Sequence, residues 1–283
     1  MLKIVNVVGA RPNFMKVAPI HRRMLRDSHF TPLLLHTGQH YDEKMSKTFF
    51  DELGMPQPDI YLGVGSGSHA EQTAAVMVAL ERHLLDNRPD WILVVGDVNS
   101  TLAASLVAAK LHIPVAHVEA GLRSYDRQMP EEINRILTDA ISNVLFITEQ
   151  SGWDNLLKEG VAEQKMHMVG NVMIDSLVEH LAKAKTSTVA RDLGVSAQGY
   201  GLMTLHRPSN VDSPEILKKI LAAVASIQTE MPVIFPIHPR TRKMLSQFGL
   251  DEAVRAMTHL TLTEPLGYLA FLKLMSEARF VLT

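Results

Sequence analysis

Two acidic segments lie close together in the sequence and could handle protons. The first, HVEAGLR, carries Glu119 at the end of an apolar run that starts at Ile113 and predicts a buried strand. The second follows Pro130, which we expect at the first position of a helix, with Glu131 and Glu132 in the first turn. The carboxyl end of a parallel strand and the start of the next helix open on the crevice where α/β sheets bind ligands. Glu119 and Glu131 are therefore a candidate acid/base pair.

Two further residues belong to this edge of the predicted sheet. Asp97 follows the strand Trp91–Gly96, and taken alone it could equally be a turn aspartate. Arg135 lies one helical turn after Glu131, so an i,i+4 ion pair with that glutamate is the structural alternative to a role in binding. The position of Asp97 beside Glu119 favours the functional interpretation.

Cations follow the first strand of each half of the chain. Arg11 and Lys16 occur in GARPNFMK, where a helix start leaves backbone N–H groups free to hold an anion. This segment is not a Walker A loop, because its second glycine and Ser/Thr are missing. His206 and Arg207 hold the equivalent place in the second half, and His238 ends the next strand. Solvated cations and a structural histidine are the alternatives to phosphate contacts.

Three classes of site are disfavoured by the sequence. The glycine-rich segment 63–68 lacks the third glycine of a dinucleotide loop, and Ser68 with Glu71 predicts a helix capping box instead. His36 and His40 have HxxxH spacing without the glutamate of a zinc protease. The chain has no cysteine, which excludes disulfides and thiolate chemistry and is compatible with a reducing cytoplasm. We therefore expect no metal and no cofactor.

Short β-branched runs alternate with longer helical patterns along the chain, which predicts βαβ units and parallel sheets. The expected strands are Ile4–Val8, Thr31–Leu35, Trp91–Val95, Val115–Val118, Val144–Ile147, Met166–Val169, Gly201–Leu205, Val233–Ile237, Leu260–Leu262 and Phe280–Leu282. Helices are expected between them, among others at Thr101–Leu111, Ile133–Ile141, Val172–Lys185, Ile216–Ile227, Thr241–Phe248 and Leu269–Ala278.

The fold class predicted from this order is α/β, with two Rossmann-like domains whose parallel sheets face a cleft. We expect an N-terminal domain at 1–172 with the carboxylates, a linking helix and connector at 173–198, and a partial C-terminal domain at 199–283. The second domain is expected to be incomplete, because the chain stops at Thr283 directly after an apolar strand.

Length and charge exclude other classes of partner. The 283 residues suffice for two domains. The formal net charge of -2 gives no reason to expect a nucleic acid or an anionic membrane. No apolar run is long enough to cross a bilayer, and the first apolar stretch is expected to be a strand rather than a signal peptide.

Taken together, GARPNFMK, GDVNST, HVEAGLRS, MPEEINR, TLHRPSN and PLGYLAFL resemble the non-hydrolysing UDP-N-acetylglucosamine 2-epimerases along essentially the whole chain. The resemblance implies the two-domain GT-B fold, a homodimer and a cytoplasmic enzyme of envelope polysaccharide synthesis. It also implies interconversion of UDP-GlcNAc and UDP-ManNAc without a cofactor. UDP is eliminated across C1–C2 to give a 2-acetamidoglucal and then adds back.

The resemblance also implies roles for individual residues. The residues that match catalytic positions are Asp97, Glu119, Glu131 and His206. Those that match UDP contacts are Arg11, Lys16, Arg135 and Phe271. Those that match an activating second UDP-GlcNAc site are Gln39, Arg207 and His238. Family members continue past the last strand here with an Asp-Ser-Gly-Gly turn, and an Arg-Gln pair used by some members is Ser66-Gly67 here.

Two other functions are compatible with the residues. A GT-B glycosyltransferase would need an acceptor sugar, and it has no use for several carboxylates at one end of the cleft. A non-catalytic nucleotide-sugar binder would bind without turnover. The helical spacing of Tyr268 and Phe271 is in addition typical of core residues, which is the alternative to a contact with the base.

Overall fold

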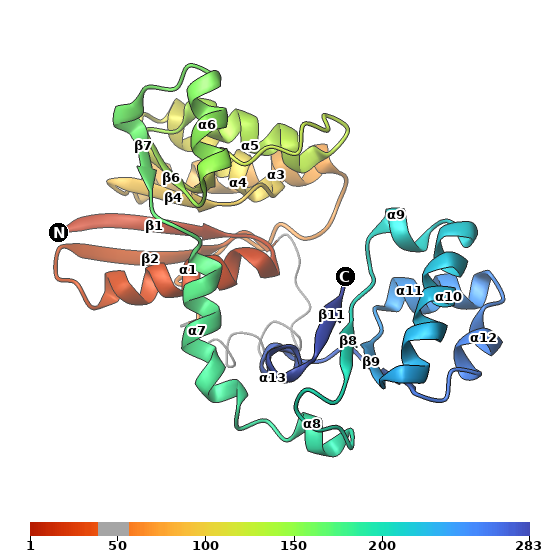
Figure 1. Ribbon diagram of the computed structural model, residues 1–283. Helices are drawn as coiled ribbons and strands as arrows, with labels where there is room; N and C mark the ends of the chain where they lie inside the picture. The colour runs from red at the N-terminus through yellow and green to blue at the C-terminus, as the bar shows by residue number, and fades with distance from the viewer. Residues whose placement is uncertain (39–56) are drawn as a thin grey trace. The chain divides into compact units, whose positions relative to one another are not determined.

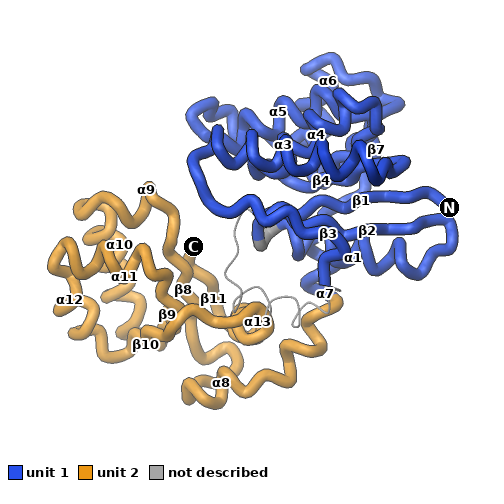
Figure 2. The backbone as a smooth tube through the Cα atoms, turned by 180° about the vertical axis from the view of Figure 1, so that it is seen from behind, with its two compact units in different colours: residues 1–178 blue, residues 179–283 orange. Residues whose placement is uncertain are grey.

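The computed structural model describes residues 1–38 and 57–283, without the side chains of residues 11 and 12. The chain forms two compact units, Met1–Val178 and Glu179–Thr283 (Figure 2). It passes from one to the other inside the segment 173–198 that we predict as a link. Each unit is described by itself below.

Unit 1 is built on a seven-stranded sheet of order β3-β2-β1-β4-β5-β6-β7 (Figure 1). All neighbouring strands in it are parallel. The strand order reverses between β1 and β4, so the carboxyl ends of these strands flank a topological switch point. The strands are β1 (Leu2–Val8), β2 (Phe30–His36), β3 (Ile60–Tyr61), β4 (Trp91–Val95), β5 (Val115–Ala120), β6 (Val144–Ile147) and β7 (Met166–Met168).

Helices cover both faces of this sheet. Side chains alternate along β1: Val5 and Val7 join the apolar core under α3 and α4. On the opposite face, the Asn6 amide contacts His21 of α1, Nδ2 to Nδ1, at 2.9 Å. The helices are α1 (Arg11–Leu25), α3 (His69–Asp86), α4 (Asn99–Lys110), α5 (Pro130–Ile141), α6 (Gln150–Lys158) and α7 (Val172–Ala184), with a 3₁₀ turn at Glu163–Lys165.

Two predicted helix starts of unit 1 are confirmed. Ser68 caps α3, accepting from the backbone N–H of Glu71, while the Glu71 carboxylate accepts from the backbone N–H of Ser68. Pro130 begins α5, with Glu131 and Glu132 in the first turn. Both acids lie where the partial positive charge of the helix start favours them.

Unit 2 contains a four-stranded parallel sheet of order β10-β9-β8-β11. Its core includes Leu217, Leu221, Phe235 and Leu245. The elements are α8 (Val189–Asp192), β8 (Gly201–Met203), α9 (Pro208–Val211), α10 (Pro214–Glu230), β9 (Val233–Pro236), α11 (Pro239–Gln247), α12 (Asp251–Arg255), β10 (Leu260–Thr263), α13 (Tyr268–Glu277) and β11 (Phe280–Leu282).

The predicted α/β class with parallel sheets is confirmed, and the predicted strands fall on observed ones. Three predicted strands were too long at their carboxyl ends: those expected to reach Val169, Leu205 and Ile237 end at Met168, Met203 and Pro236. β8 pairs with β11 from Gly201 to Met203, and the chain then turns into α9, where Arg207 holds the N-cap position without a side-chain capping bond. His206 therefore lies in a loop rather than at the last position of a strand.

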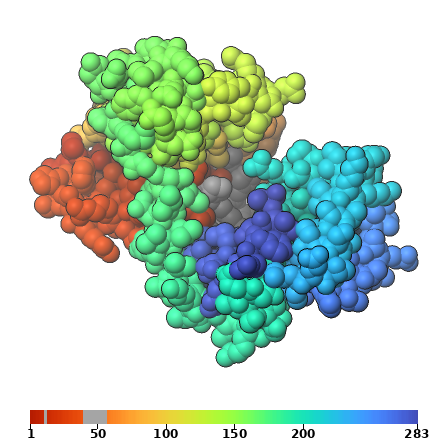
Figure 3. All heavy atoms as spheres, viewed as in Figure 1, coloured from red at the N-terminus to blue at the C-terminus, as the bar shows by residue number. Residues whose placement is uncertain are grey.

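The surface of unit 1 includes apolar side chains on α7. This helix lies on the viewed face of the space-filling picture (Figure 3). Ile174 and Val178 on it are 61% and 64% exposed. In the described residues, no helix has the length and apolar character that crossing a membrane requires.

Candidate active site

The two carboxylates nearest the switch point owe their positions to unusual backbone. Gly96, directly after β4, has a φ of +68°, which glycine adopts without strain, and Asp97 follows it in the turn between β4 and α4. Glu119 has a φ of +72° at a register shift between Val118 and Ala120 in β5. Such a bulge re-aims a side chain, and a left-handed glutamate is costly enough to indicate a functional constraint.

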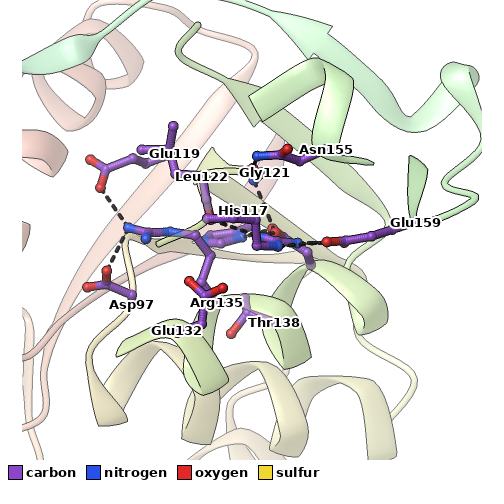
Figure 4. A network of polar contacts seen from close by, with 12 residues as sticks. Asp97, His117, Glu119, Gly121, Leu122, Glu132, Arg135, Thr138, Asn155 and Glu159 are labelled. Atoms are coloured by element: carbon purple, nitrogen blue, oxygen red, sulfur yellow. Dashed lines mark hydrogen bonds and ion pairs between the residues drawn. The ribbon is translucent and has the colours of Figure 1, made fainter. Parts of the chain in front are cut away.

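Two cations join these carboxylates into one cluster, and Figure 4 shows the contacts of one of them, Arg135, with Asp97 and Glu119. The Arg135 Nη2 atom lies 2.7 Å from Asp97 Oδ2 and 3.0 Å from Glu119 Oε1. On the other side, Lys16 Nζ lies 2.5 Å from Glu119 Oε2. Helix α1 supplies the lysine and α5 the arginine, so elements far apart in sequence meet at one sheet edge.

Arg135 is therefore not the partner of Glu131. The ion pair that we considered as the structural alternative is not formed in the described part of the chain, because Arg135 points to Asp97 and Glu119 instead. The Nε atom of Arg135 is buried and has no hydrogen-bond partner among the described residues. An unsatisfied buried donor of this kind is suited to a ligand oxygen.

The carboxyl of Asp97 is electrostatically distinct. Burial raises its pKa above the ordinary 3.8, although Arg135 and Lys16 act to lower it. Glu119 and Glu131 add to the rise in pKa, so the exposed Glu131 lies close enough for its charge to act on Asp97. A perturbed carboxyl among other charged groups is typical of proton-transfer sites.

Two asparagines that we did not predict hold this edge together. Asn13 accepts from the backbone N–H of Ala10 at 3.0 Å and donates to the Val95 carbonyl at 2.9 Å, which ties the start of α1 to the end of β4. Asn134 of α5 donates to the Asp97 carbonyl at 2.8 Å. In the sequence, each is only a polar residue within the first turns of a helix, which is a weak indication of such a role.

A second polar network lies behind the carboxylates and is almost completely buried. His117 Nδ1 lies 2.7 Å from Asp139 Oδ1, and His117 Nε2 lies 2.8 Å from the Gly96 carbonyl oxygen. Asp139 Oδ2 also accepts from the Gly121 N–H at 3.0 Å and pairs with Arg123 at 2.8 Å. Burial acts to raise the pKa of Asp139, but His117 and Arg123 outweigh it, and the pKa is lowered.

The segment after Glu119 is held by further contacts. Glu132 accepts from the backbone N–H groups of Ser124 and Tyr125 at 2.7 and 3.1 Å, so its carboxylate is occupied with the loop. Asn155 of α6 donates to the Gly121 carbonyl at 3.0 Å. Of the two first-turn glutamates, Glu131 is thus the one with a side chain exposed to a ligand.

Unit 2 carries four of the predicted residues, which are described here by themselves. His206 and His238 follow neighbouring strands, and their ring centroids lie 6.1 Å apart. Both are exposed, as is Arg207. Phe271 is partly buried against the core under α13, as expected for its helical spacing. These residues sit at the carboxyl ends of β8 and β9 or on α13, and their roles stay a prediction.

The remaining predicted residues are only partly described. Arg11 begins α1, but its side chain lies outside the description, and Gln39 and His40 lie outside the described residues. Among the residues that are described, no group of three or more His, Cys, Asp or Glu is arranged to hold a metal ion.

Comparison with known proteins identifies the family. The model of the family described as UDP-N-acetylglucosamine 2-epimerase matches residues 22–283. A UDP-N-acetylglucosamine 2-epimerase homolog of Methanococcus maripaludis is 46% identical over 284 residues, covering 100% of this chain and 78% of the relative. The chain belongs to the UDP-N-acetylglucosamine 2-epimerase family.

Other members of the epimerase family are similarly close. A UDP-2,3-diacetamido-2,3-dideoxy-D-glucuronate 2-epimerase of Pseudomonas aeruginosa is 41% identical, with 100% of this chain and 78% of the relative covered. The UDP-GlcNAc 2-epimerase of Methanocaldococcus jannaschii, solved in complex with UDP-GlcNAc and UDP, has a TM-score of 0.86 at 42% identity. That similarity covers 99% of this chain and 78% of the other. The predicted family and its GT-B fold are thus confirmed.

Proposed function

We propose that the protein is a UDP-N-acetylglucosamine 2-epimerase that interconverts UDP-GlcNAc and UDP-ManNAc. Membership of the family supports the activity. The observation that carries the mechanism is the cluster of Asp97, Glu119, Lys16 and Arg135 at the switch point of unit 1. It combines groups that move protons with groups that bind a diphosphate.

The carboxylates perform the proton transfers. One removes the proton from C2 of the sugar while the C1–O bond breaks and its electron pair leaves with UDP, so that a C1–C2 double bond forms. A second carboxyl returns a proton to the opposite face of C2 as UDP adds back to C1. Asp97, Glu119 and Glu131 are the candidates, and the raised pKa of Asp97 suits a group that carries a proton.

The cations stabilise the leaving group. UDP gathers negative charge as the C1–O bond breaks, and preorganised donors aimed at that charge lower the barrier. Lys16 and Arg135 already lie beside the carboxylates, and Arg11 begins the same helix as Lys16.

We assign His206 to the same leaving group, Phe271 to the uracil base, and Gln39, Arg207 and His238 to a second, activating UDP-GlcNAc. Sigmoidal rate dependence on UDP-GlcNAc would test the last assignment, and a hyperbolic one would contradict it.

Incubation with UDP-GlcNAc in deuterated water tests the function. We expect deuterium at C2 of the sugar and the appearance of UDP-ManNAc, both followed by NMR, without any acceptor. Turnover that requires an acceptor sugar would indicate a glycosyltransferase instead. UDP-sugar binding in a calorimeter with neither exchange nor product would indicate a binding protein.

We also propose that the enzyme is a homodimer of the cytoplasm that supplies envelope polysaccharide synthesis. Val78 and Leu85 of α3 and Leu137 of α5 are exposed apolar side chains that a second copy could cover. Sedimentation velocity of the protein tests the dimer, and a monomer at every concentration would contradict it. Cell fractionation tests the cytoplasmic location, and the polysaccharide content of a deletion strain tests the role in envelope polysaccharide synthesis.

A further inference from the structure

Asp139 is a buried carboxylate that the proposed reaction does not use. Its side chain is 1% exposed, and it lies on the last turn of α5, behind the cluster that Glu119 joins. A buried carboxylate is costly unless hydrogen bonds and opposite charges compensate it. The partners that compensate Asp139 therefore indicate what it holds in place.

One oxygen of Asp139 reaches the turn that carries Asp97. Asp139 Oδ1 accepts from His117 Nδ1 at 2.7 Å, and His117 Nε2 donates to the Gly96 carbonyl at 2.8 Å. Gly96 is the left-handed residue directly before Asp97. The imidazole of His117, which lies on β5, thus connects α5 to the end of β4.

The other oxygen reaches the turn that follows Glu119. Asp139 Oδ2 accepts from the Gly121 N–H at 3.0 Å, and Gly121 is also left-handed, with a φ of +82°. Glu119 itself has a φ of +72°, a conformation that persists only where the surroundings over-determine it.

We propose that Asp139 is a positioning residue that holds both carboxylate-bearing turns in register, Asp97 through His117 and Glu119 through Gly121. It touches no substrate and acts on the two carboxylates through these two bonds, while its ion pair with Arg123 compensates the buried charge. Misplacement of a reacting group by about 1 Å can cost about 100-fold in rate, so loss of either bond should appear in kcat. The inference rests on the proposed epimerase function.

Two substitutions at this position separate geometry from charge. In Asp139→Asn the new amide oxygen can accept from Gly121, and its NH₂ can donate to Nδ1 of a neutral imidazole that still donates to Gly96. In Asp139→Leu neither bond can form. We expect kcat of Asp139→Leu to fall about 10- to 100-fold with KM within about threefold of wild type, and Asp139→Asn to recover most of that loss. Each kcat is divided by the fraction of chains that bind UDP in a calorimeter, which removes any effect of partial unfolding.

A second variant and a control keep the test independent of the folding of Asp139→Leu. His117→Phe keeps an aromatic ring but removes the bonds to Gly96 and Asp139, and we expect a similar fall in kcat. Glu159→Gln removes the negative charge of the surface partner of Arg123, 2.7 Å away, and should leave kcat unchanged. Wild-type kcat in Asp139→Leu and His117→Phe, or Asp139→Asn as slow as Asp139→Leu, would overturn the proposal. An inactive wild-type chain would contradict the epimerase function itself, and the inference with it.

Discussion

At the scale of single residues, the candidate site contains carboxylates in an environment or a backbone conformation that is energetically unfavourable for them. Asp97 keeps a raised pKa because burial disfavours its ionised form, in spite of the nearby Arg135 and Lys16. Glu119 occupies a backbone conformation that few glutamates adopt. Sites that perform chemistry commonly cost stability in this way.

The raised pKa of Asp97 gives a pH-dependent prediction. The folded protein binds this proton more tightly than the unfolded chain, so the stabilisation is fully present below the ordinary pKa of 3.8 and is lost as pH rises through the raised value. Asparagine does not ionise, so Asp97→Asn does not lose stability in this way as pH rises. The free energy of unfolding of the variant minus that of wild type should therefore increase with pH from about 4 upward.

Urea unfolding at a series of pH values measures this difference. Asp27→Asn is the control, since hydrogen bonds from His29 lower the pKa of Asp27. The stabilisation by the Asp27 carboxylate is fully present above its ordinary pKa of 3.8 and is lost only as pH falls through the lowered pKa. The free energy of unfolding of Asp27→Asn minus that of wild type should therefore not change with pH above about pH 5. A flat profile for Asp97→Asn from about pH 4 to about pH 7 would show that its ionisation costs nothing.

The candidate site residues at strand ends and helix starts could be predicted from the sequence, because the patterns that mark these positions are local. Asp97, Glu119 and Lys16 each follow a recognisable strand or helix start. His117 and Asp139 could not be paired in advance, because 22 residues separate them and no local spacing links one to the other. The helical spacing of Arg135 indicated Glu131 as its ion-pair partner. This was wrong, because Arg135 makes its ion pairs with Asp97 and Glu119, which are distant in sequence.

At the scale of elements, two helix starts and one strand reversal position the site. Helix α1 brings Lys16, and α5 brings Arg135, to Glu119 near the end of β5. The alternation of strands and helices was readable, because apolar runs and caps are local features. The bulge at Glu119 was not, since no glycine or proline marks it in the sequence.

The capping box of α3 gives a prediction at this scale. Ser68→Ala removes the side chain that accepts from the Glu71 N–H, and we expect it to lower the free energy of unfolding by about 1 kcal/mol. Thr73→Ala on the same helix removes only an exposed bond to the His69 carbonyl and should stay within about 0.5 kcal/mol. Urea denaturation measures both, and equal effects would contradict a specific role for the cap.

At the scale of the whole molecule, the two compact units divide the proposed work. Unit 1 holds the carboxylates and Lys16, whereas unit 2 holds His206 and Phe271. Parallel sheets and the family could be predicted from alternation and motifs. The division of labour between the units stays a prediction, because it depends on long-range geometry that no local pattern encodes.

The central claim is that the cluster around Glu119 moves the C2 proton. Deuterium incorporation from solvent into C2 of UDP-GlcNAc, compared between wild type, Glu119→Gln and Glu159→Gln, tests it most directly. We predict that Glu119→Gln slows incorporation by about 100- to 10,000-fold, the usual contribution of a general acid or base, while Glu159→Gln matches wild type. Incorporation at the wild-type rate in Glu119→Gln would contradict the account.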